Sequence, residues 1–174
     1  MTPLVRRSWA PRGQPPVLVH KARHREKVSV AGALWLSPLR DRLGLFFETI
    51  PDGYFDSEDV AGFVEDLLRE LRRPAIILWD GGTMHKGPPI NELVQRYKGQ
   101  LALERLPPHA PELMPMEQTW TWLKYSRLCN FAPHNATQLN DRVLDELRAI
   151  HDNQELLRAF FHASDLPLPR ALLS

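Results

Sequence analysis

Two segments of the chain each end an apolar run and place a carboxylate just beyond it. Residues 76–82 read Ile-Ile-Leu-Trp-Asp-Gly-Gly and carry Asp80, and residues 106–117 read Leu-Pro-Pro-His-Ala-Pro-Glu-Leu-Met-Pro-Met-Glu and carry Glu117. The prolines of the second segment exclude regular structure as far as Pro115. Two separated carboxylates suit a divalent-metal site, because Mg²⁺ takes oxygen ligands and is usually held by one or two carboxylates together with substrate phosphates.

The apolar patterning predicts an α/β chain. Strands are expected over residues 28–36, 43–50, 75–79 and 101–106, the first two forming an antiparallel hairpin. Helices are expected over 57–71 with Ser57 as N-cap, over 89–97, from about Met116, and over 137–161 with an interruption at His151–Asn153. The continuous apolar run at 75–79 is typical of a strand buried on both faces.

Composition restricts the class of protein. A length of 174 residues fits one domain, and 43% hydrophobic with 25% charged residues is ordinary for a soluble globular protein. The only cysteine, Cys129, forms no internal disulfide, which fits a reducing cytoplasm. No apolar run approaches the roughly 20 residues that span a membrane, and the N-terminus lacks the features of a signal peptide. We therefore expect a cytoplasmic protein.

Positive charge is concentrated at the N-terminus. Residues 1–27 hold seven basic residues and one acidic residue, a net charge of +6, whereas the rest of the chain carries −5. A basic segment on a weakly acidic domain suits contact with a nucleic-acid backbone. The alternative from charge alone is a solvated terminus without a partner.

These motifs resemble the catalytic domain of DDE transposases of the mariner-type superfamily, in its bacterial insertion-sequence branch. In that family the second catalytic Asp closes a hydrophobic strand and is soon followed by a His, as Asp80 is followed by His85. The third acid lies in a Leu-Pro-Pro-x-x-Pro-x-Leu-x-Pro-x-Glu segment followed by Trp and Lys, as Glu117 does. Residues 6–13, Arg-Arg-Ser-Trp-Ala-Pro-Arg-Gly, match a segment that the family places after its first strand.

The resemblance implies a ribonuclease-H-like fold, with a mixed sheet flanked by helices. It implies that residues 1–174 form a single DDE endonuclease domain that is incomplete at its N-terminus. The family's first strand and its Asp would precede the segment at Trp9, and no carboxylate precedes Glu26. The resemblance also leads us to expect that the upstream helix-turn-helix domain of such transposases is missing.

The resemblance also implies a function, namely metal-dependent DNA strand cleavage and strand transfer in transposition. Intact members hold two Mg²⁺ or Mn²⁺ ions with three carboxylates and act as oligomers on double-stranded DNA, both transposon ends and target. Here Asp80 and Glu117 would be the catalytic metal ligands. With two acids alone, the chain is expected to be inactive. It would be either the downstream half of a frameshifted transposase or a decayed fragment.

Each assignment has an alternative. Asp80 followed by glycine also suits a turn, Glu117 in a first helical turn also suits the helix dipole, and His85 is either a supporting residue at the site or a loop histidine. The expected DNA-backbone contacts are Arg6, Arg7, Arg12, Lys21 and Arg23. For the whole chain, the alternatives are a non-catalytic DNA-binding or assembly remnant of a transposase and a structure-specific nuclease of the same fold.

Overall fold

The computed structural model describes residues 4–7, 9–15, 17–18, 27–39 and 42–166. Its strands and helices follow in the order β1 (Val28–Leu36), β2 (Leu43–Pro51), α1 (Ser57–Leu71), β3 (Ala75–Trp79), α2 (Pro88–Arg96), β4 (Leu101–Arg105), α3 (Pro115–Trp122), α4 (Ala136–His151) and α5 (Gln154–His162). Two 3₁₀ turns, η1 (Thr83–His85) and η2 (Pro111–Leu113), and a π-helical segment, η3 (Leu123–Arg127), lie between them. The predicted order of elements is confirmed, and the proline-rich segment contains only the short turn η2.

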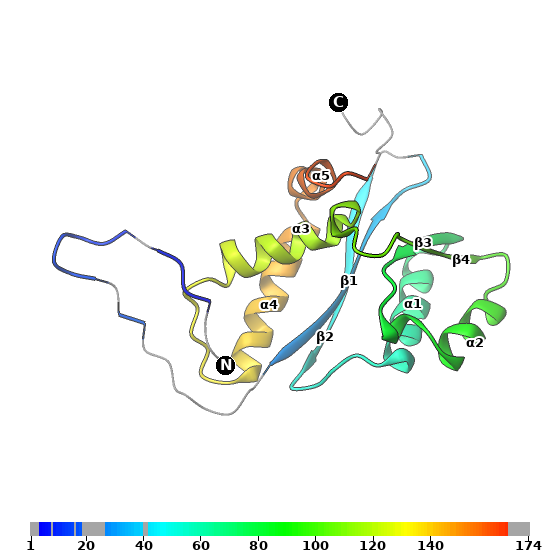
Figure 1. Cartoon of the computed structure of the whole chain (residues 1–174), viewed down its shortest axis with the longest axis horizontal. Coiled ribbons are helices and arrows are strands. Elements are labelled where there is room, and N and C mark those ends of the chain that lie inside the picture. The colour runs from blue at the N-terminus through cyan, green and yellow to red at the C-terminus, as the bar shows by residue number, and fades with distance from the viewer. Residues whose placement is uncertain (1–3, 8, 16, 19–26, 40–41, 167–174) are drawn as a thin grey trace.

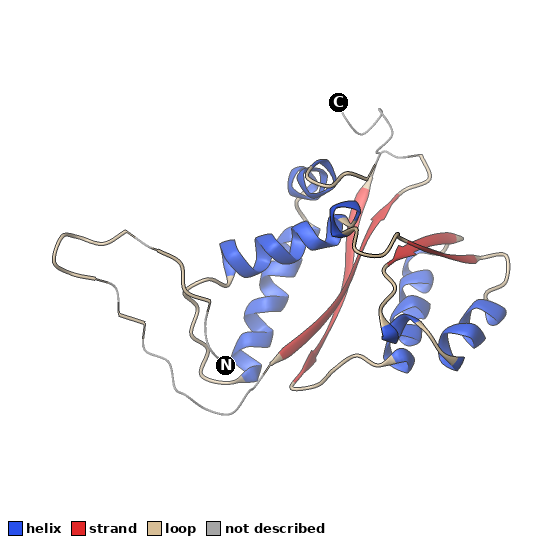
Figure 2. Ribbon diagram, viewed as in Figure 1, coloured by secondary structure: helices blue, strands red, loops and turns tan. Residues whose placement is uncertain are grey.

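The β1–β2 hairpin lies at the centre of the molecule, with helices on both sides (Figures 1 and 2). Its strands pair antiparallel along their whole length, as the sequence predicts. One face packs on α3, α4 and α5 through a buried cluster that includes Leu43 and Leu45. On the other face, which packs on α1, the ring of Phe46 lies 5.0 Å from the ring of Phe63. The hairpin is therefore the layer that joins the two groups of helices.

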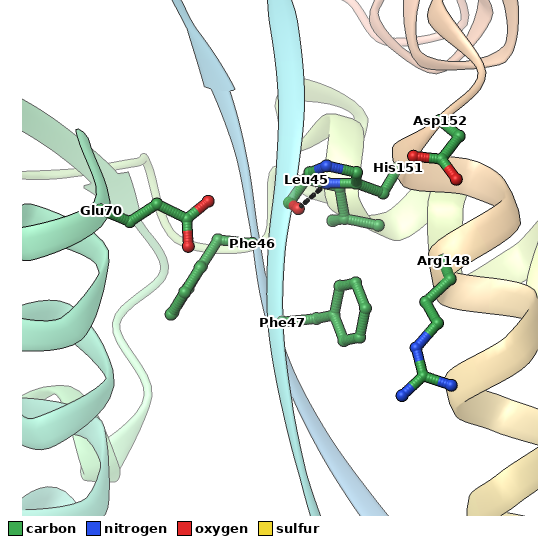
Figure 3. Close-up of a pocket in the computed structure, with 7 residues that line it drawn as sticks. All are labelled: Leu45, Phe46, Phe47, Glu70, Arg148, His151 and Asp152. Atoms are coloured by element: carbon green, nitrogen blue, oxygen red, sulfur yellow. Dashed lines mark hydrogen bonds between the residues drawn. The ribbon is translucent and has the colours of Figure 1, made fainter.

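Side chains from the corner between α4 and α5 cover the start of the outer edge of β2. The Gln154 amide donates from Nε2 to the Leu43 carbonyl (2.8 Å) and accepts at Oε1 from the Leu43 N–H (3.3 Å). The Nδ1 atom of His151 lies 2.7 Å from the Leu45 carbonyl, a contact drawn in Figure 3. These contacts occupy the main-chain groups that a further strand would need there. The predicted interruption at His151–Asn153 forms this corner.

Strands β3 and β4 form a separate two-stranded parallel sheet. One face of this sheet carries Trp79 and Leu101 into a buried cluster with α1 and α2. The opposite face carries Ile76, which is 72% exposed, and Leu78, which is 47% exposed. The prediction that β3 is buried on both faces is therefore wrong, because helices cover only one face of it in the described part of the chain.

The single mixed sheet that the sequence predicts is divided in two. Within the described residues, β1 pairs only with β2, and β3 pairs only with β4. The two sheets still lie against a common core, because Ala31 and Ala33 of β1 pack on the same cluster as Ala75 and Ile77 of β3. The parallel and antiparallel halves of a mixed sheet are both present, without hydrogen bonds between them.

Helix α1 begins with a capping box at Asp56. The sequence-based prediction of Ser57 as the N-cap is therefore wrong. The Asp56 side chain accepts hydrogen bonds from the N–H groups of Glu58 (2.8 Å) and Asp59 (3.0 Å), and the Asp59 carboxylate accepts from the Asp56 N–H (2.9 Å). Both residue types cap helices, but only Asp56 has an acid three positions later that can reach back. The hydrogen bond from the Asp59 N–H, followed by that from Glu58, lowers the pKa of the Asp56 carboxyl below its ordinary value of 3.8.

We expect Asp56→Ala to lower the urea midpoint of unfolding at neutral pH, because two N–H groups at the start of α1 lose their acceptor. A lowered folded-state pKa stabilises the fold above pH 3.8, and that stabilisation is lost as the pH falls through the lowered value. The difference between wild type and variant should therefore narrow in acid. Ser57→Ala is the control and should change the midpoint little. Equal effects of the two substitutions would contradict the assignment of the cap.

Candidate active site

Asp80 follows the last residue of β3 and stands at the surface. Its neighbour Trp79 is buried, whereas the Asp80 side chain is 61% exposed. The Asp80 Oδ1 atom accepts a hydrogen bond from the Gly82 N–H (2.8 Å), and the Nδ1 atom of His85 lies 2.8 Å from the same oxygen. Among the described residues, nothing hydrogen-bonds to Oδ2. Asp80 therefore stabilises a turn and still offers one carboxylate oxygen to a ligand. A role as a turn residue and a role as a metal ligand are thus compatible.

The ring of His85 is held in place on two sides. It stacks on the indole of Trp79, with 4.5 Å between centroids and 5° between planes. Its Nδ1 also lies 3.2 Å from the Asp80 carbonyl oxygen. Donation from Nδ1 to Asp80 requires the ring proton on that nitrogen. The expected proximity of His85 to Asp80 is thus present, whereas the stacking on Trp79 had no signal in the sequence beyond an aromatic residue before the Asp.

The two glycines after Asp80 differ in whether the structure leaves room for a side chain at their positions. A Cβ atom on Gly82 would lie 2.9 Å from Asp80 Oδ1 and 3.5 Å from His85 Nδ1, whereas a Cβ on Gly81 would meet nothing within 4 Å. Only Gly82 is therefore needed for the contact between Asp80 and His85. Gly81 faces open space.

Glu117 lies in the first turn of α3, and its side chain is exposed. The segment leading to it starts beside Asp80, because the Leu106 N–H donates to the Trp79 carbonyl (2.9 Å). The start of α3 is seated closely on the hairpin. A Cβ on Gly32 of β1 would lie 2.7 Å from Met116 Cε and 2.9 Å from the Trp120 ring.

The structure brings together Asp80 and His85, and it places Glu117 at the far end of the proline-rich segment without a direct bond to either. Within the described ranges, no group of three or more His, Cys, Asp and Glu side chains is arranged to hold a metal ion. Shared metal ligation by Asp80 and Glu117 stays a prediction.

The basic N-terminal stretch is docked beside η3 at one point. The Arg6 guanidinium donates to the Tyr125 carbonyl (2.6 Å), and the Arg6 N–H donates to Asn130 Oδ1 (2.9 Å). The Asn130 N–H in turn donates to the Leu4 carbonyl (2.7 Å). Arg6 therefore has a structural role that its charge did not indicate. Arg7 and Arg12 are exposed, and Lys21 and Arg23 lie outside the described residues.

A buried carboxylate fixes η3 on α4. Glu146 is 4% exposed and receives Arg127 Nε at 2.6 Å and Arg142 Nη2 at 2.7 Å. The hydrogen bond to Glu146 raises the pKa of the Arg127 guanidinium. Arg127 also lies over the Trp122 ring, 5.4 Å from its centre. This network connects the end of the helix that carries Glu117 to α4.

The family of the chain follows from its comparison with known domains. The model of the DDE superfamily endonuclease family matches residues 2–140, and the chain belongs to that family. No curated protein matches it. In the part of the chain that the structure describes, no helix is long and apolar enough to cross a membrane.

The fold is shared with solved structures of Mos1 transposase. The strand transfer complex superposes with a TM-score of 0.62 at 14% identity, covering 92% of this chain and 46% of that one. The mariner paired-end complex with Mn superposes with a TM-score of 0.62 at 16% identity, covering 93% of this chain and 48% of that one. The paired-end complex with the left transposon end superposes with a TM-score of 0.63 at 14% identity, covering 95% of this chain and 48% of that one. The ribonuclease-H-like α/β fold is thereby confirmed, and the chain spans about half the length of these proteins.

We expect Gly82→Ala to displace the Asp80 carboxylate and release His85 from Trp79, because the added methyl group would lie 2.9 Å from Asp80 Oδ1. The measurement is the ring-current shift of the His85 ring protons by NMR, which the stacked indole produces. Gly81→Ala is the matched control and should leave these resonances in place. The prediction fails if both variants keep the shifted His85 signals while their urea midpoints match that of the wild type.

Proposed function

We propose that this chain belongs to the catalytic domain of a transposase of the insertion-sequence branch. Its reaction would be metal-dependent DNA strand cleavage and strand transfer. The observation that carries the proposal is the presentation of Asp80 beyond the end of β3 in a chain of the DDE endonuclease family. Ligands of open α/β sheets bind beyond the carboxyl ends of the strands, where Asp80 lies.

Asp80 and Glu117 are the proposed ligands for Mg²⁺ or Mn²⁺, with two ions in a complete site. The described residues fit one part of such a site, since Asp80 Oδ2 is free and both carboxylates are exposed. A bound divalent metal pair supplies an activated nucleophile and stabilises the leaving oxygen of a phosphodiester. One of the similar structures is described as a complex with Mn.

The residues around Asp80 would hold it ready for this role. His85 and the Gly82 N–H both contact Oδ1, so the carboxylate is held through one oxygen, and the second has no hydrogen bond to the described residues. Stacking on the buried Trp79 ring limits the movement of the His85 ring. Such positioning of a ligand by its neighbours is a usual feature of metal sites.

The chain alone is proposed to be inactive. Two carboxylates offer few ligands, and the described residues contain no cluster of three acids, histidines or cysteines. The resemblance implies a third acid on the family's first strand. The alternative is a remnant that keeps DNA binding or assembly without chemistry, and the same lack of a third ligand favours it.

Double-stranded DNA is the proposed partner, with the chain acting as a homo-oligomer on transposon ends and target in the cytoplasm. The solved relatives in fold are described as paired-end and strand transfer complexes. Arg7 and Arg12 are exposed residues of the described N-terminal stretch, and both are available for phosphate contacts. Lys21 and Arg23 are proposed to join them, whereas Arg6 would act mainly by docking the stretch beside η3.

We expect no strand cleavage of transposon-end DNA by the 174-residue chain with Mg²⁺ or Mn²⁺, and cleavage once an upstream strand ending in Asp is joined to it. In the restored protein, Glu117→Gln should abolish cleavage, because a metal ligand is lost. Glu112→Gln is the control, since Glu112 is also exposed and lies in the same segment. Cleavage by the chain alone, or equal activity of the two variants, would contradict the assignment.

We expect the double variant Arg7→Ala/Arg12→Ala to weaken binding to all duplexes alike and to flatten the salt dependence. Each phosphate contact contributes about 0.9 to the slope of log K against log salt, so the slope should fall by up to about 1.8. Fluorescence anisotropy at several salt concentrations measures it. Arg72→Ala/Arg73→Ala, which removes two exposed arginines at the end of α1, is the control. An unchanged slope would mean that the stretch is a solvated terminus.

A further inference from the structure

A hollow of about 410 Å³ lies along the outer edge of β2 and contains none of the residues of the candidate active site. Residues 45–47 of the strand line it. Helix α1 borders one side with Glu70, and the end of α4 borders the other with Arg148, His151 and Asp152 (Figure 3). We call this hollow the edge pocket, because it follows the strand edge that β1 leaves open.

Main-chain groups of β2 beside the edge pocket have no partner in the described part of the chain. The Asp52 N–H donates to the Lys27 carbonyl at one end of the hairpin, so the even-numbered residues of β2 bond to β1. In an antiparallel pair the intervening residues direct their N–H and C=O groups to the other side. Side chains of the α4–α5 corner reach no further along this side than the Leu45 carbonyl. The N–H and C=O groups of Phe47 and Thr49 are therefore open to a ligand.

The charge of the edge pocket favours a cation. The carboxylates of Glu70 and Asp152 are exposed, and neither forms an ion pair within the described residues. Glu70 lies in the last turn of α1 and Asp152 caps the end of α4, where the helix dipole adds partial negative charge. Arg148 also lines the pocket, but its guanidinium lies 3.3 Å from a further carboxylate, that of Asp145. The pocket therefore attracts basic groups and repels phosphates.

We propose that the edge pocket binds a short extended segment of a second polypeptide, in which two adjacent basic residues are flanked by apolar ones. The segment pairs with the open main-chain groups of Phe47 and Thr49, and such strand addition is an established mode of peptide recognition. Successive side chains of a strand point to opposite faces. Glu70 and Asp152 lie on opposite sides of β2 (Figure 3), so two adjacent basic residues place one cation beside each carboxylate. The apolar neighbours pack on the partly exposed rings of Phe46 and Phe47.

A second copy of this chain and a nucleic acid match the edge pocket less well. Two copies paired through β2 about a two-fold axis would bring the unpaired carboxylates of both copies to one interface, because Glu70 and Asp152 border the edge on its two sides. A nucleic acid carries phosphates, which these carboxylates repel. Its backbone also lacks the alternating N–H and C=O groups that an open strand edge pairs with.

The test is amide hydrogen exchange by NMR on the full 174-residue chain with and without synthetic peptides. The probe is acetyl-Thr-Val-Lys-Lys-Val-Thr-amide. In the free chain the amides of Phe47 and Thr49 should exchange quickly, whereas those of Phe46 and Glu48, which bond to β1, should exchange slowly. A nearly saturating concentration of the probe should slow the Phe47 and Thr49 amides about tenfold.

Two control peptides separate the contributions of charge and of strand pairing. The first has Glu-Glu in place of Lys-Lys and should give no protection, because it meets carboxylates in the edge pocket. The second keeps both lysines and has Pro in place of the second Val, which removes a main-chain donor, and it should give little protection. Equal protection by the probe and by either control would overturn the proposal.

A pair of variants makes the result specific to the edge pocket. Glu70→Gln/Asp152→Asn should weaken binding of the probe about fivefold, because two exposed ion pairs are lost. Glu92→Gln/Asp141→Asn removes the same charge from exposed sites that do not line the pocket and should leave binding unchanged. Slow exchange at Phe46 and Glu48 verifies that each variant is folded.

Three further results would each overturn the proposal. They are slow exchange of the Phe47 and Thr49 amides in the free chain at low concentration, slowing that rises with chain concentration alone, and no response to millimolar probe. The second of these would mean that another copy of the chain covers the edge. None of the readouts depends on metal or DNA, so this proposal and the proposed function stand or fall separately.

Discussion

Burial of the β1–β2 hairpin between two groups of helices is the interaction on which the structure depends. Leu43 and Leu45 on one face hold α3, α4 and α5, and Phe46 on the other contacts α1. Because side chains alternate between the faces of a strand, one hairpin serves two cores at once. The start of α3 lies so close to β1 that a side chain at Gly32 would collide with it, so the hairpin also sets the position of Glu117.

The candidate site combines two halves that are held in place by different contacts. Asp80 is fixed by Gly82 and His85, and His85 is fixed by a buried indole. Glu117 is placed by α3, which the Glu146 network connects to α4 through η3. The two halves belong to different packing units, and a metal site made from both depends on how the β3–β4 sheet is held against the hairpin.

The division of the sheet therefore bears on function as well as on stability. Main-chain groups on β1 and β3 lack partners within the described residues, while Ile76 and Leu78 face solvent.

The sequence by itself determined the local elements and the family. Period-two and helical patterns located the hairpin, β3, β4, α1 and the α4–α5 break, because those patterns reflect which side of each element is apolar. The proline-rich segment and the Asp-Gly-Gly turn identified Asp80 and Glu117 as candidates. Each of these patterns can be recognised within a single helix, strand or turn, without knowledge of the rest of the chain.

Only the tertiary structure decided what each element faces. An apolar run such as β3 reads the same whether one face or two are covered, so the exposure of Ile76 required knowledge of the layers. The docking of Arg6 on Tyr125 and the burial of Glu146 join residues more than a dozen positions apart, with no periodic signal. The shift of the α1 cap from Ser57 to Asp56 depended on which side chain could reach the free N–H groups. The contacts of Arg6 and Glu146 arise from packing between distant segments, which local sequence does not encode.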